Sequence, residues 1–194
     1  MGVRLAKVKR RLPRHAHQLD RAEVEASQRW RILEAMVEVV SRTGHAAASV
    51  ADVIERAGVS RKTFYEHFSG KEDCFLAAYQ VLSERLIHDL EGIPTRSRQL
   101  HRFLEVLSGD LRAARVFMVE VQGAGPRALA DRAEINRRFG AVFLRGLKLD
   151  PVCVQAVVGG INQVVAGALL ERSSNLMALE APLNAFVAAA ISRR

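Results

Sequence analysis

Apolar and polar residues follow one another along most of this chain with the three- and four-residue spacing of amphipathic helices. The clearest case is residues 20–43, where a single apolar stripe predicts one buried helix face. The stripe consists of Ile32, Leu33, Met36, Val37 and Val40. Asp20 followed by Glu23 has the pattern of a capping box, so we expect the helix to begin near Asp20 and to end at Thr43, before Gly44.

Glycine and proline interrupt this pattern and divide the chain into about nine predicted helices. The abundance of Ala, Leu and Val, with only 6% aromatic residues, favours helices throughout. The predicted helices span about residues 20–43, 50–57, 61–68, 70–90, 95–107, 110–121, 126–146, 151–172 and 182–192. We find no internal repeat, and 194 residues are enough for one or two helical domains with a substantial core.

Two short helices joined by a tight turn are predicted between Ser49 and Phe68. Ser49 can cap the first helix, with Asp52 completing a capping box. Gly58 can take the positive φ that ends this helix, and Ser60 can cap the second. This is the arrangement of a helix-turn-helix unit, whose second helix enters the DNA major groove. The next helix is expected to be capped by a serine, Ser69, with Glu72 at the reciprocal position.

The second short helix has one apolar and one polar face. At about 100° per residue, Phe64 and Phe68 fall on the side that can enter a core. The opposite face would meet base edges, and the flanks would lie over the groove walls, where the phosphates are. The outer face carries Lys62, Thr63 and Glu66, and the flanks carry Arg61, Tyr65 and His67.

The segment AGVSRKTFYEHFSGKEDCF, within residues 49–75 and preceded by the amphipathic helix, resembles the DNA-binding domain of the TetR family of bacterial transcriptional regulators (TetR/AcrR type). The resemblance covers roughly residues 27–80. Beyond that, only the length, the helical pattern and the fragment VEVQGAGPRAL at 119–129 are similar. It implies an all-α protein with a three-helix helix-turn-helix domain at 20–70 and a helical effector-binding and dimerisation domain at 71–194.

Base recognition is expected from Arg61 and Lys62, because Arg or Lys to guanine O6 and N7 is the commonest specific contact. The resemblance adds Tyr65 in the groove. It further implies phosphate contacts from Ser49, Thr63, His67 and Lys71.

The net charge of +8 is concentrated in residues 1–19, which contain six basic and no acidic residues. The six are Arg4, Lys7, Lys9, Arg10, Arg11 and Arg14. This segment has little to bury, so we expect a flexible arm. The arm either follows phosphates or enters the minor groove, or else it is a solvated tail.

The segment at 151–172 is apolar almost all round, and three interpretations compete for it. A transmembrane span is disfavoured by its interrupting Gln and Asn residues. A helix buried within one subunit remains open. A dimer helix is favoured, because small residues permit close helix approach and the resemblance places a four-helix dimer interface in the last two long helices. The expected interface residues are Gly159, Gly160, Gln163, Gly167 and Phe186.

The middle helices are expected to form the effector pocket, with an ordinary packed core as the alternative. The predicted apolar lining is Phe103, Leu107, Phe117, Met118, Phe139 and Phe143. Polar candidates are His101, Arg112, Arg115, Glu120, Gln122 and Asn136. The stretch between residues 90 and 109 is shorter than such proteins usually have, which weakens the expectation of a large cavity.

Enzymatic and metal-binding functions find no support in the sequence. Histidines lack ligand spacing, and no phosphate loop or nucleophile elbow is present. Cys74 and Cys153 form no metal pair. Cys74, near a helix start, could have a lowered thiol pKa and act as a redox sensor, but a small buried residue is the favoured alternative. Two distant cysteines, and a basic N-terminus without an apolar run behind it, suit a cytoplasmic protein.

The sequence therefore predicts a cytoplasmic homodimeric regulator, without cofactor or metal, that binds double-stranded, palindromic operator DNA. A small apolar or amphipathic effector would release it. The competing hypothesis is an architectural DNA-binding protein that uses the basic arm and senses nothing.

Overall fold

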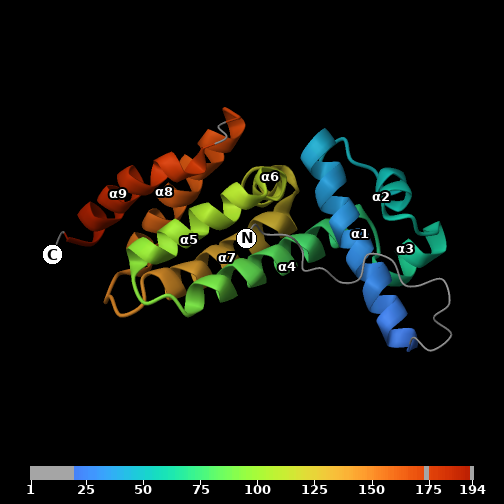
Figure 1. Ribbon diagram of the computed structural model, residues 1–194, viewed down its shortest axis with the longest axis horizontal. Helices are drawn as coiled ribbons and strands as arrows, with labels where there is room; N and C mark the ends of the chain where they lie inside the picture. The colour runs from blue at the N-terminus through green and yellow to red at the C-terminus, as the bar shows by residue number, and fades with distance from the viewer. Residues whose placement is uncertain (1–19, 173–174, 193–194) are drawn as a thin grey trace.

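The structure is a computed structural model that describes residues 20–172 and 175–192. Within these ranges the chain folds into nine α-helices and two short 3-10 helices, without strands (Figure 1). The α-helices are α1 (Arg21–Thr43), α2 (Val50–Ala57), α3 (Arg61–His67), α4 (Lys71–Glu91), α5 (Arg96–Gly109), α6 (Leu111–Met118), α7 (Pro126–Phe143), α8 (Pro151–Leu170) and α9 (Glu180–Ser192). The 3-10 helices are η1 (Glu120–Gly123) and η2 (Leu176–Leu179). The all-α prediction is confirmed. The six basic residues of the predicted arm lie outside the described residues.

Helices α1 to α3 form a small bundle at one end of the molecule, and α5 to α9 form a larger bundle at the other (Figure 1). Helix α4 joins them, since it begins beside α1 and packs along α7 and α5. Both bundles share one continuous apolar core.

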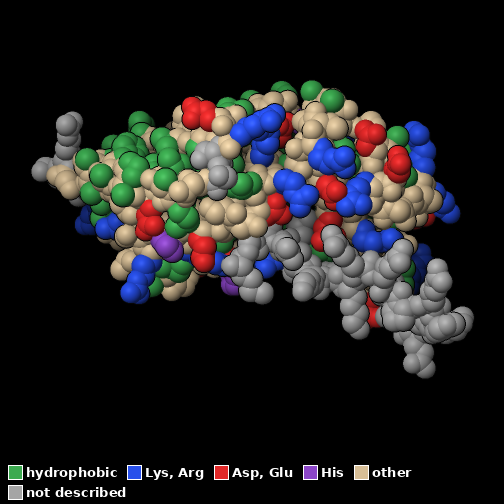
Figure 2. Space-filling view, turned by 45° about the horizontal axis from the view of Figure 1, so that its top comes forward, with side chains coloured by type: hydrophobic (Ala, Val, Ile, Leu, Met, Phe, Trp, Pro, Cys, Tyr) green, Lys and Arg blue, Asp and Glu red, His purple; other side chains and the backbone are tan. Residues whose placement is uncertain are grey.

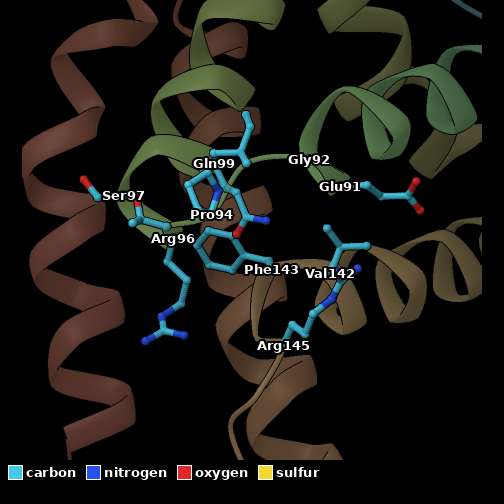
Figure 3. A pocket seen from close by; sticks show the side chains of 11 residues that line it. Glu91, Gly92, Pro94, Arg96, Ser97, Gln99, Val142, Phe143 and Arg145 are labelled. Carbon is cyan, nitrogen blue, oxygen red and sulfur yellow. The ribbon is translucent and has the colours of Figure 1, made fainter.

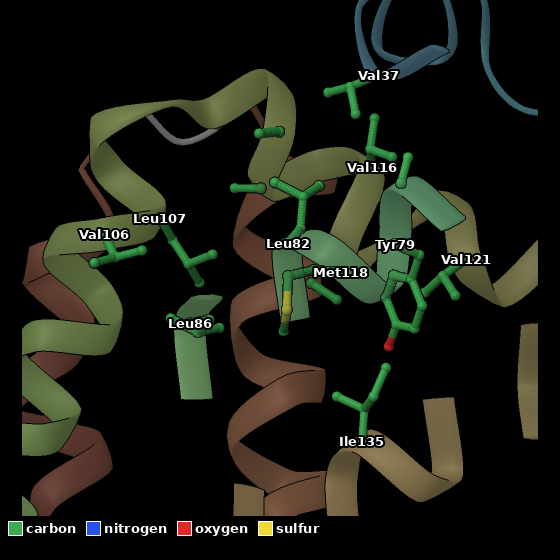
Figure 4. Packing of buried hydrophobic residues seen from close by; sticks show 14 of the residues in the cluster. Val37, Tyr79, Leu82, Leu86, Val106, Leu107, Val116, Met118, Val121 and Ile135 are labelled. Atoms are coloured by element: carbon green, nitrogen blue, oxygen red, sulfur yellow. The ribbon is translucent and has the colours of Figure 1, made fainter. Parts of the chain in front are cut away.

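The stripe predicted on α1 is buried, because it faces α2, α4 and α6. Val37 of α1 lies next to Val116 of α6, and Tyr79 of α4 packs beyond them above Ile135 of α7 (Figure 4). Side chains from four helices thus meet between the two bundles, so the small bundle rests on the large one through packed apolar groups rather than through a linker.

Five predicted helix ends differ from the structure by two or three residues, among them those of α5, which ends at Gly109, and of α8, which ends at Leu170. Helix α6 stops at Met118 and η1 continues the chain, α7 stops at Phe143, and α9 begins at Glu180. The fourth helix has Gly70 as its N-cap, with no side-chain cap, so the expected Ser69–Glu72 box is wrong. Ser69 instead donates from its backbone N–H and its hydroxyl to the carboxylate of Asp73, at 2.8 and 3.1 Å.

Helix α8 is long and apolar enough to cross a membrane when judged by length and composition alone. The buried core helix of a globular protein passes the same test. One face of α8 packs on α6 and α7, and the Asn162 amide donates to the Asn136 amide oxygen of α7 at 2.8 Å. This polar contact within the bundle fits a packed helix better than a lipid-facing one.

Candidate nucleic-acid interface

Helix α2 begins and ends as its sequence predicts. The Ser49 hydroxyl accepts the Asp52 N–H at 3.2 Å, and the Asp52 carboxylate accepts the Ser49 N–H at 3.0 Å, so the capping box is complete. The Ser49 hydroxyl also donates to the Asp52 carboxylate at 2.7 Å, and this bond, followed by the bond from the Ser49 N–H, lowers the pKa of the exposed Asp52 carboxyl. At the other end Gly58 is left-handed, with φ 62° and ψ 44°, and its N–H returns to the last turn. The turn therefore has one defined geometry.

Helix α3 starts at a second serine cap. The Ser60 hydroxyl accepts the Thr63 N–H at 3.0 Å and lies 2.9 Å from the Thr63 hydroxyl. The backbone of Ser60 is extended and α3 begins at the next residue, Arg61, so this one capping residue sets the direction of the helix.

Two phenylalanines hold α3 in place. Phe64 is fully buried and Phe68 is nearly so, as the helical wheel predicts. The Arg29 guanidinium of α1 lies 4.7 Å from the centroid of the Phe68 ring, a cation–π contact that the sequence analysis missed. Nothing in the local sequence pairs residues 29 and 68, so only the fold could show it.

The face of α3 away from these phenylalanines is open to solvent. Arg61, Lys62 and Glu66 are exposed, and Tyr65 is 46% exposed. The Arg61 guanidinium lies 5.6 Å from the centroid of the Tyr65 ring, and the Lys62 ammonium is 3.9 Å from the Glu66 carboxylate. Such an exposed ion pair contributes little to stability, so Lys62 remains free to exchange its partner for another acceptor.

The remaining residues predicted to contact DNA lie around this face, and several of them already make hydrogen bonds within the protein. Thr63 and His67 are half-buried, and the hydroxyls of Ser49 and Thr63 take part in the caps. Lys71 donates from Nζ to the backbone carbonyls of His45 and Ala46, at 2.9 and 3.3 Å. Its ammonium therefore holds the α1–α2 loop, a role that the sequence did not suggest, and one of its three N–H groups is left for a phosphate.

The α1–α2 loop is held from the opposite side as well. The Glu120 carboxylate of η1 accepts the His45 backbone N–H at 2.9 Å and lies 3.7 Å from the Arg115 guanidinium. The His45 ring packs 4.6 Å from the Phe75 ring, and burial, followed by the nearby Lys71 charge, lowers its pKa. Glu120, expected to be a pocket residue, is thus a link between the large bundle and the loop that leads into α2.

Helix α2 is further tied to α1 by the ion pair between Arg56 and Glu38, with 2.5 Å between nitrogen and oxygen. The hydrogen bond from Arg56 lowers the pKa of the Glu38 carboxyl despite the opposing effect of burial. The two helices that carry and support α3 are therefore joined by polar as well as apolar contacts.

The opposite end of the molecule is apolar on its surface. Figure 2 shows hydrophobic side chains gathered over α8 and α9, whereas Lys and Arg are frequent towards the α1–α3 end. The exposed large apolar residues there are Val152, Val164, Leu170 and Phe186. Gln163 is exposed too, and Gly159, Gly160 and Gly167 are half-buried. Gly160 faces Phe186 of its own chain, so it packs within the subunit as well as near the predicted interface.

The six predicted pocket residues pack largely against one another, as in the alternative of an ordinary core, although Phe143 also lines a pocket at the end of the large bundle. The Phe139 ring stacks on Phe143 at a centroid distance of 5.6 Å and packs at a tilt against Phe103 at 5.3 Å, and Phe117 packs 5.1 Å from Tyr79. Met118 is buried, and the cavity beside Leu107 and Phe117 has a volume of only about 10 Å³. The aromatic rings thus occupy the interior in which the sequence predicted a cavity.

The polar pocket candidates are engaged elsewhere. His101 contacts the Glu180 carboxylate through Nδ1 at 2.9 Å, and the Gln122 amide donates to the Met118 carbonyl at 2.8 Å. Arg112 lies 3.9 Å from the Asp110 carboxylate that caps α6.

The redox interpretation of Cys74 is also wrong. Its thiol is fully buried, and burial raises its pKa to about 12. Burial disfavours the charged thiolate more than the N-terminus of α4 stabilises it, so the thiol stays protonated and unreactive at neutral pH. In the part of the chain that the structure describes, no group of three or more His, Cys, Asp or Glu could hold a metal ion.

Comparison with known proteins supports this geometry. Residues 32–78 match the profile of bacterial regulatory proteins, tetR family. An uncharacterised HTH-type transcriptional regulator of Bacillus subtilis, YvdT, is 33% identical over 90 residues, which are 46% of this chain and 43% of that protein. The fatty acid metabolism regulator protein of the same organism is 27% identical over 139 residues, covering 66% of this chain and 68% of its own length.

The whole fold is similar to that of a solved regulator. The structure of the transcriptional regulator FadR from Bacillus subtilis, in complex with stearoyl-CoA, superposes with a TM-score of 0.67 at 22% identity. The superposition covers 84% of this chain and 97% of that one, so both bundles are shared. With the profile match on α1 to α4 and the capped turn between α2 and α3, residues 32–78 belong to the tetR family of bacterial regulatory proteins.

Proposed function

We propose that this protein is a homodimeric, sequence-specific transcriptional repressor that leaves its operator when a small molecule binds. Residues 20–70 bind DNA, and residues 71–194 bind the effector and form the dimer. The partner is double-stranded, palindromic DNA, and the protein works in the cytoplasm, where that DNA is.

The observation that carries the proposal is the exposed polar face of α3. Arg61, Lys62 and Tyr65 project from a helix that Phe64 and Phe68 hold against the core. A helix fixed in this way keeps its side chains in one register, which base recognition in the major groove requires. Arg61 and Lys62 read guanine edges, Tyr65 reaches the groove, and Ser49, Thr63, His67 and Lys71 contact phosphates.

Dimerisation is supported by the apolar face of α8 and α9. A monomer with one α3 reaches one half-site, whereas a two-fold dimer reaches two half-sites one turn of DNA apart, about 34–36 Å. Contiguous exposed apolar residues at the end farthest from α3 are the surface that such a dimer would bury.

Effector release is supported by the contacts between the bundles. Glu120 of η1 and Lys71 of α4 hold the same loop, from which α2 begins. An effector that binds more tightly to a state with shifted η1 or α4 would move the population away from the DNA-binding state. The FadR relative was solved with stearoyl-CoA, which supports an amphipathic effector for this chain as well.

Footprinting on random DNA fragments tests the proposal. We expect the full-length protein to select one palindrome and to protect two half-sites on the same face of the helix. An architectural DNA-binding protein would coat all fragments alike and would respond to salt but not to sequence.

A further inference from the structure

A pocket of about 520 Å³ lies at the end of the large bundle, away from the filled core. Its wall comes from the α4–α5 loop, the first turn of α5 and the last turn of α7. Its volume is within the range of small-molecule sites. Sequence analysis predicted only Phe143 of its lining, because the lining residues come from segments about fifty residues apart.

The pocket joins an apolar wall to two cationic side chains. Phe143 and Val142 form the wall with Pro94, and Figure 3 shows Phe143 between Arg96 and Arg145. Phe143 is nearly fully buried and stacks on Phe139, so the wall is rigid. Because Phe143 is 1% and Val142 8% exposed, Pro94 supplies most of the apolar surface that a ligand can cover.

The two guanidinium groups have no carboxylate within salt-bridge distance among the described residues, whereas Arg56, Arg102 and Arg138 of this chain all have one. Arg96 is half-buried, and Arg145 is exposed at the pocket mouth. Glu91, the one acidic residue of the lining, lies near His88, at 3.7 Å. The lining therefore keeps two positive charges against one negative charge, which favours an anionic ligand group.

Two other polar groups complete the lining. Thr95 accepts the Arg98 N–H with its hydroxyl and the Gln99 N–H with its carbonyl, so the N–H groups of Arg96 and Ser97 have no acceptor within the helix. The Gln99 amide, 6% exposed, donates to the Leu90 carbonyl at 3.1 Å, which fixes its orientation at the pocket.

We propose that this pocket binds a small organic acid, with the carboxylate on Arg96 and Arg145 and the apolar body on Phe143, Val142 and Pro94. The proposal rests on the proposed function, in which the acid is the effector. The pocket holds the C-terminal end of α4, while Lys71 at the N-terminal end of the same helix holds the α1–α2 loop. An occupant that shifts α4 therefore acts on the loop that leads into α2.

The test is isothermal titration calorimetry on the full-length protein without DNA. The probes are phenylacetate and octanoate, each compared with its neutral amide, phenylacetamide and octanamide. We expect at least one acid to bind and its amide to bind about tenfold or more weakly, because charge-assisted hydrogen bonds to Arg are lost. Preference for phenylacetate identifies an aromatic body and preference for octanoate an aliphatic one.

The variants are the double change Arg96→Gln and Arg145→Gln, and Lys148→Gln as the matched control. Lys148 is exposed on the loop after α7 and does not line the pocket. The double variant should lose about tenfold or more in acid affinity, and Lys148→Gln should bind as the parent does. If thermal melting shows that the double variant is unfolded, Arg145→Gln alone gives the same comparison at an exposed position.

Absence of binding by both acids, or equal binding by parent and double variant, overturns the inference. Operator affinity is measured separately, with and without the acid. A protein that selects an operator but binds neither acid keeps the proposed function and loses only this pocket. A protein that binds an acid through these arginines but selects no DNA site loses the proposed function instead.

Discussion

The two ends of this molecule expose opposite kinds of surface. Helix α3 presents Arg61, Lys62 and Tyr65 to solvent, whereas α8 and α9 present Val164, Phe186 and their apolar neighbours. The first surface suits a charged, hydrated partner, whose binding weakens with salt. The second suits a partner of the same apolar kind, whose binding rests on water release and responds little to salt. One fold therefore separates DNA binding from self-association by chemistry as well as by distance.

The largest effect is expected at the apolar end. Val164 is 45% exposed on α8, so Val164→Glu leaves the subunit intact but buries an unpaired charge in the proposed interface. We expect a loss of about 3–5 kcal/mol in dimer stability, monomers in light scattering, and no operator binding at concentrations where the parent binds. Leu129→Glu, at a position of α7 that is 48% exposed, is the control and should remain dimeric. A dimeric Val164→Glu would place the interface elsewhere.

The next effect belongs to the basic segment 1–19. Each neutralised phosphate contributes about 0.9 to the salt dependence of log K, so if two or three residues engage per subunit, removing the segment should reduce the slope by roughly 4–5. Operator titrations by fluorescence anisotropy at several salt concentrations measure this, and the preferred site should not change. A slope that stays the same would identify a solvated tail, and a changed site preference would identify minor-groove reading. Dimer dissociation, measured in parallel, should hardly respond to the truncation.

A smaller and more selective effect is expected within α3. Lys62→Ala should weaken the cognate complex by about 1–3 kcal/mol and should leave random DNA almost unaffected. Lys71→Ala should weaken all sequences alike, and because Lys71 also holds the α1–α2 loop, it should lower the melting temperature too. Competition assays with cognate and random duplexes distinguish the two. Equal losses for Lys62→Ala on both duplexes would remove it from base recognition.

The smallest effect concerns the Glu38–Arg56 pair. Arg56→Gln should cost about 0.2–1 kcal/mol of stability at neutral pH, as for a largely exposed ion pair. The folded pKa of Glu38 lies below its unfolded value, so this contribution is present above the unfolded pKa and is lost as the pH falls through the folded one. Urea denaturation of parent and variant at pH 7, and at a pH below the ordinary Glu value of 4.5, should therefore show the difference shrink. A constant difference would show that Arg56 acts by packing alone.

The two ends also differ in how far the sequence predicted them. Around α2 and α3 the signals are short-range, because a serine, an aspartate three residues on and one glycine determine caps and turn from neighbouring backbone atoms. All three were predicted, and so was the burial of Phe64 and Phe68. Contacts between distant residues, such as Arg29 on Phe68 or Glu120 at His45, depend on helix packing and have no local signal.

In the large bundle the helices were predicted but the cavity was not. The spacing of Phe103, Phe139 and Phe143 shows that they share an interior, yet it does not show whether the rings face a space or one another. They stack, since dense packing gains contacts that an empty cavity forgoes. The pocket forms instead at the loop that contains Gly92 and Pro94, between α4 and α5. Hydrophobic periodicity shows only that a helix ends at this loop and gives no sign of a pocket there.

At the apolar end, Gly160 lets α9 pack closely against α8. A Cβ at this position would lie 2.9 Å from Cζ of Phe186, so the ring of α9 rests directly on the backbone of α8. A larger residue there must push the ring away, and because Phe186 is 42% exposed, the ring can rotate outward without any change in the angle at which α9 crosses α8. In the proposed dimer that angle sets the separation of the two α3 helices, and with it the number of base pairs between half-sites. A single methyl group at Gly160 would thus leave that separation unchanged and alter only the shape of the apolar surface, by turning the Phe186 ring outward.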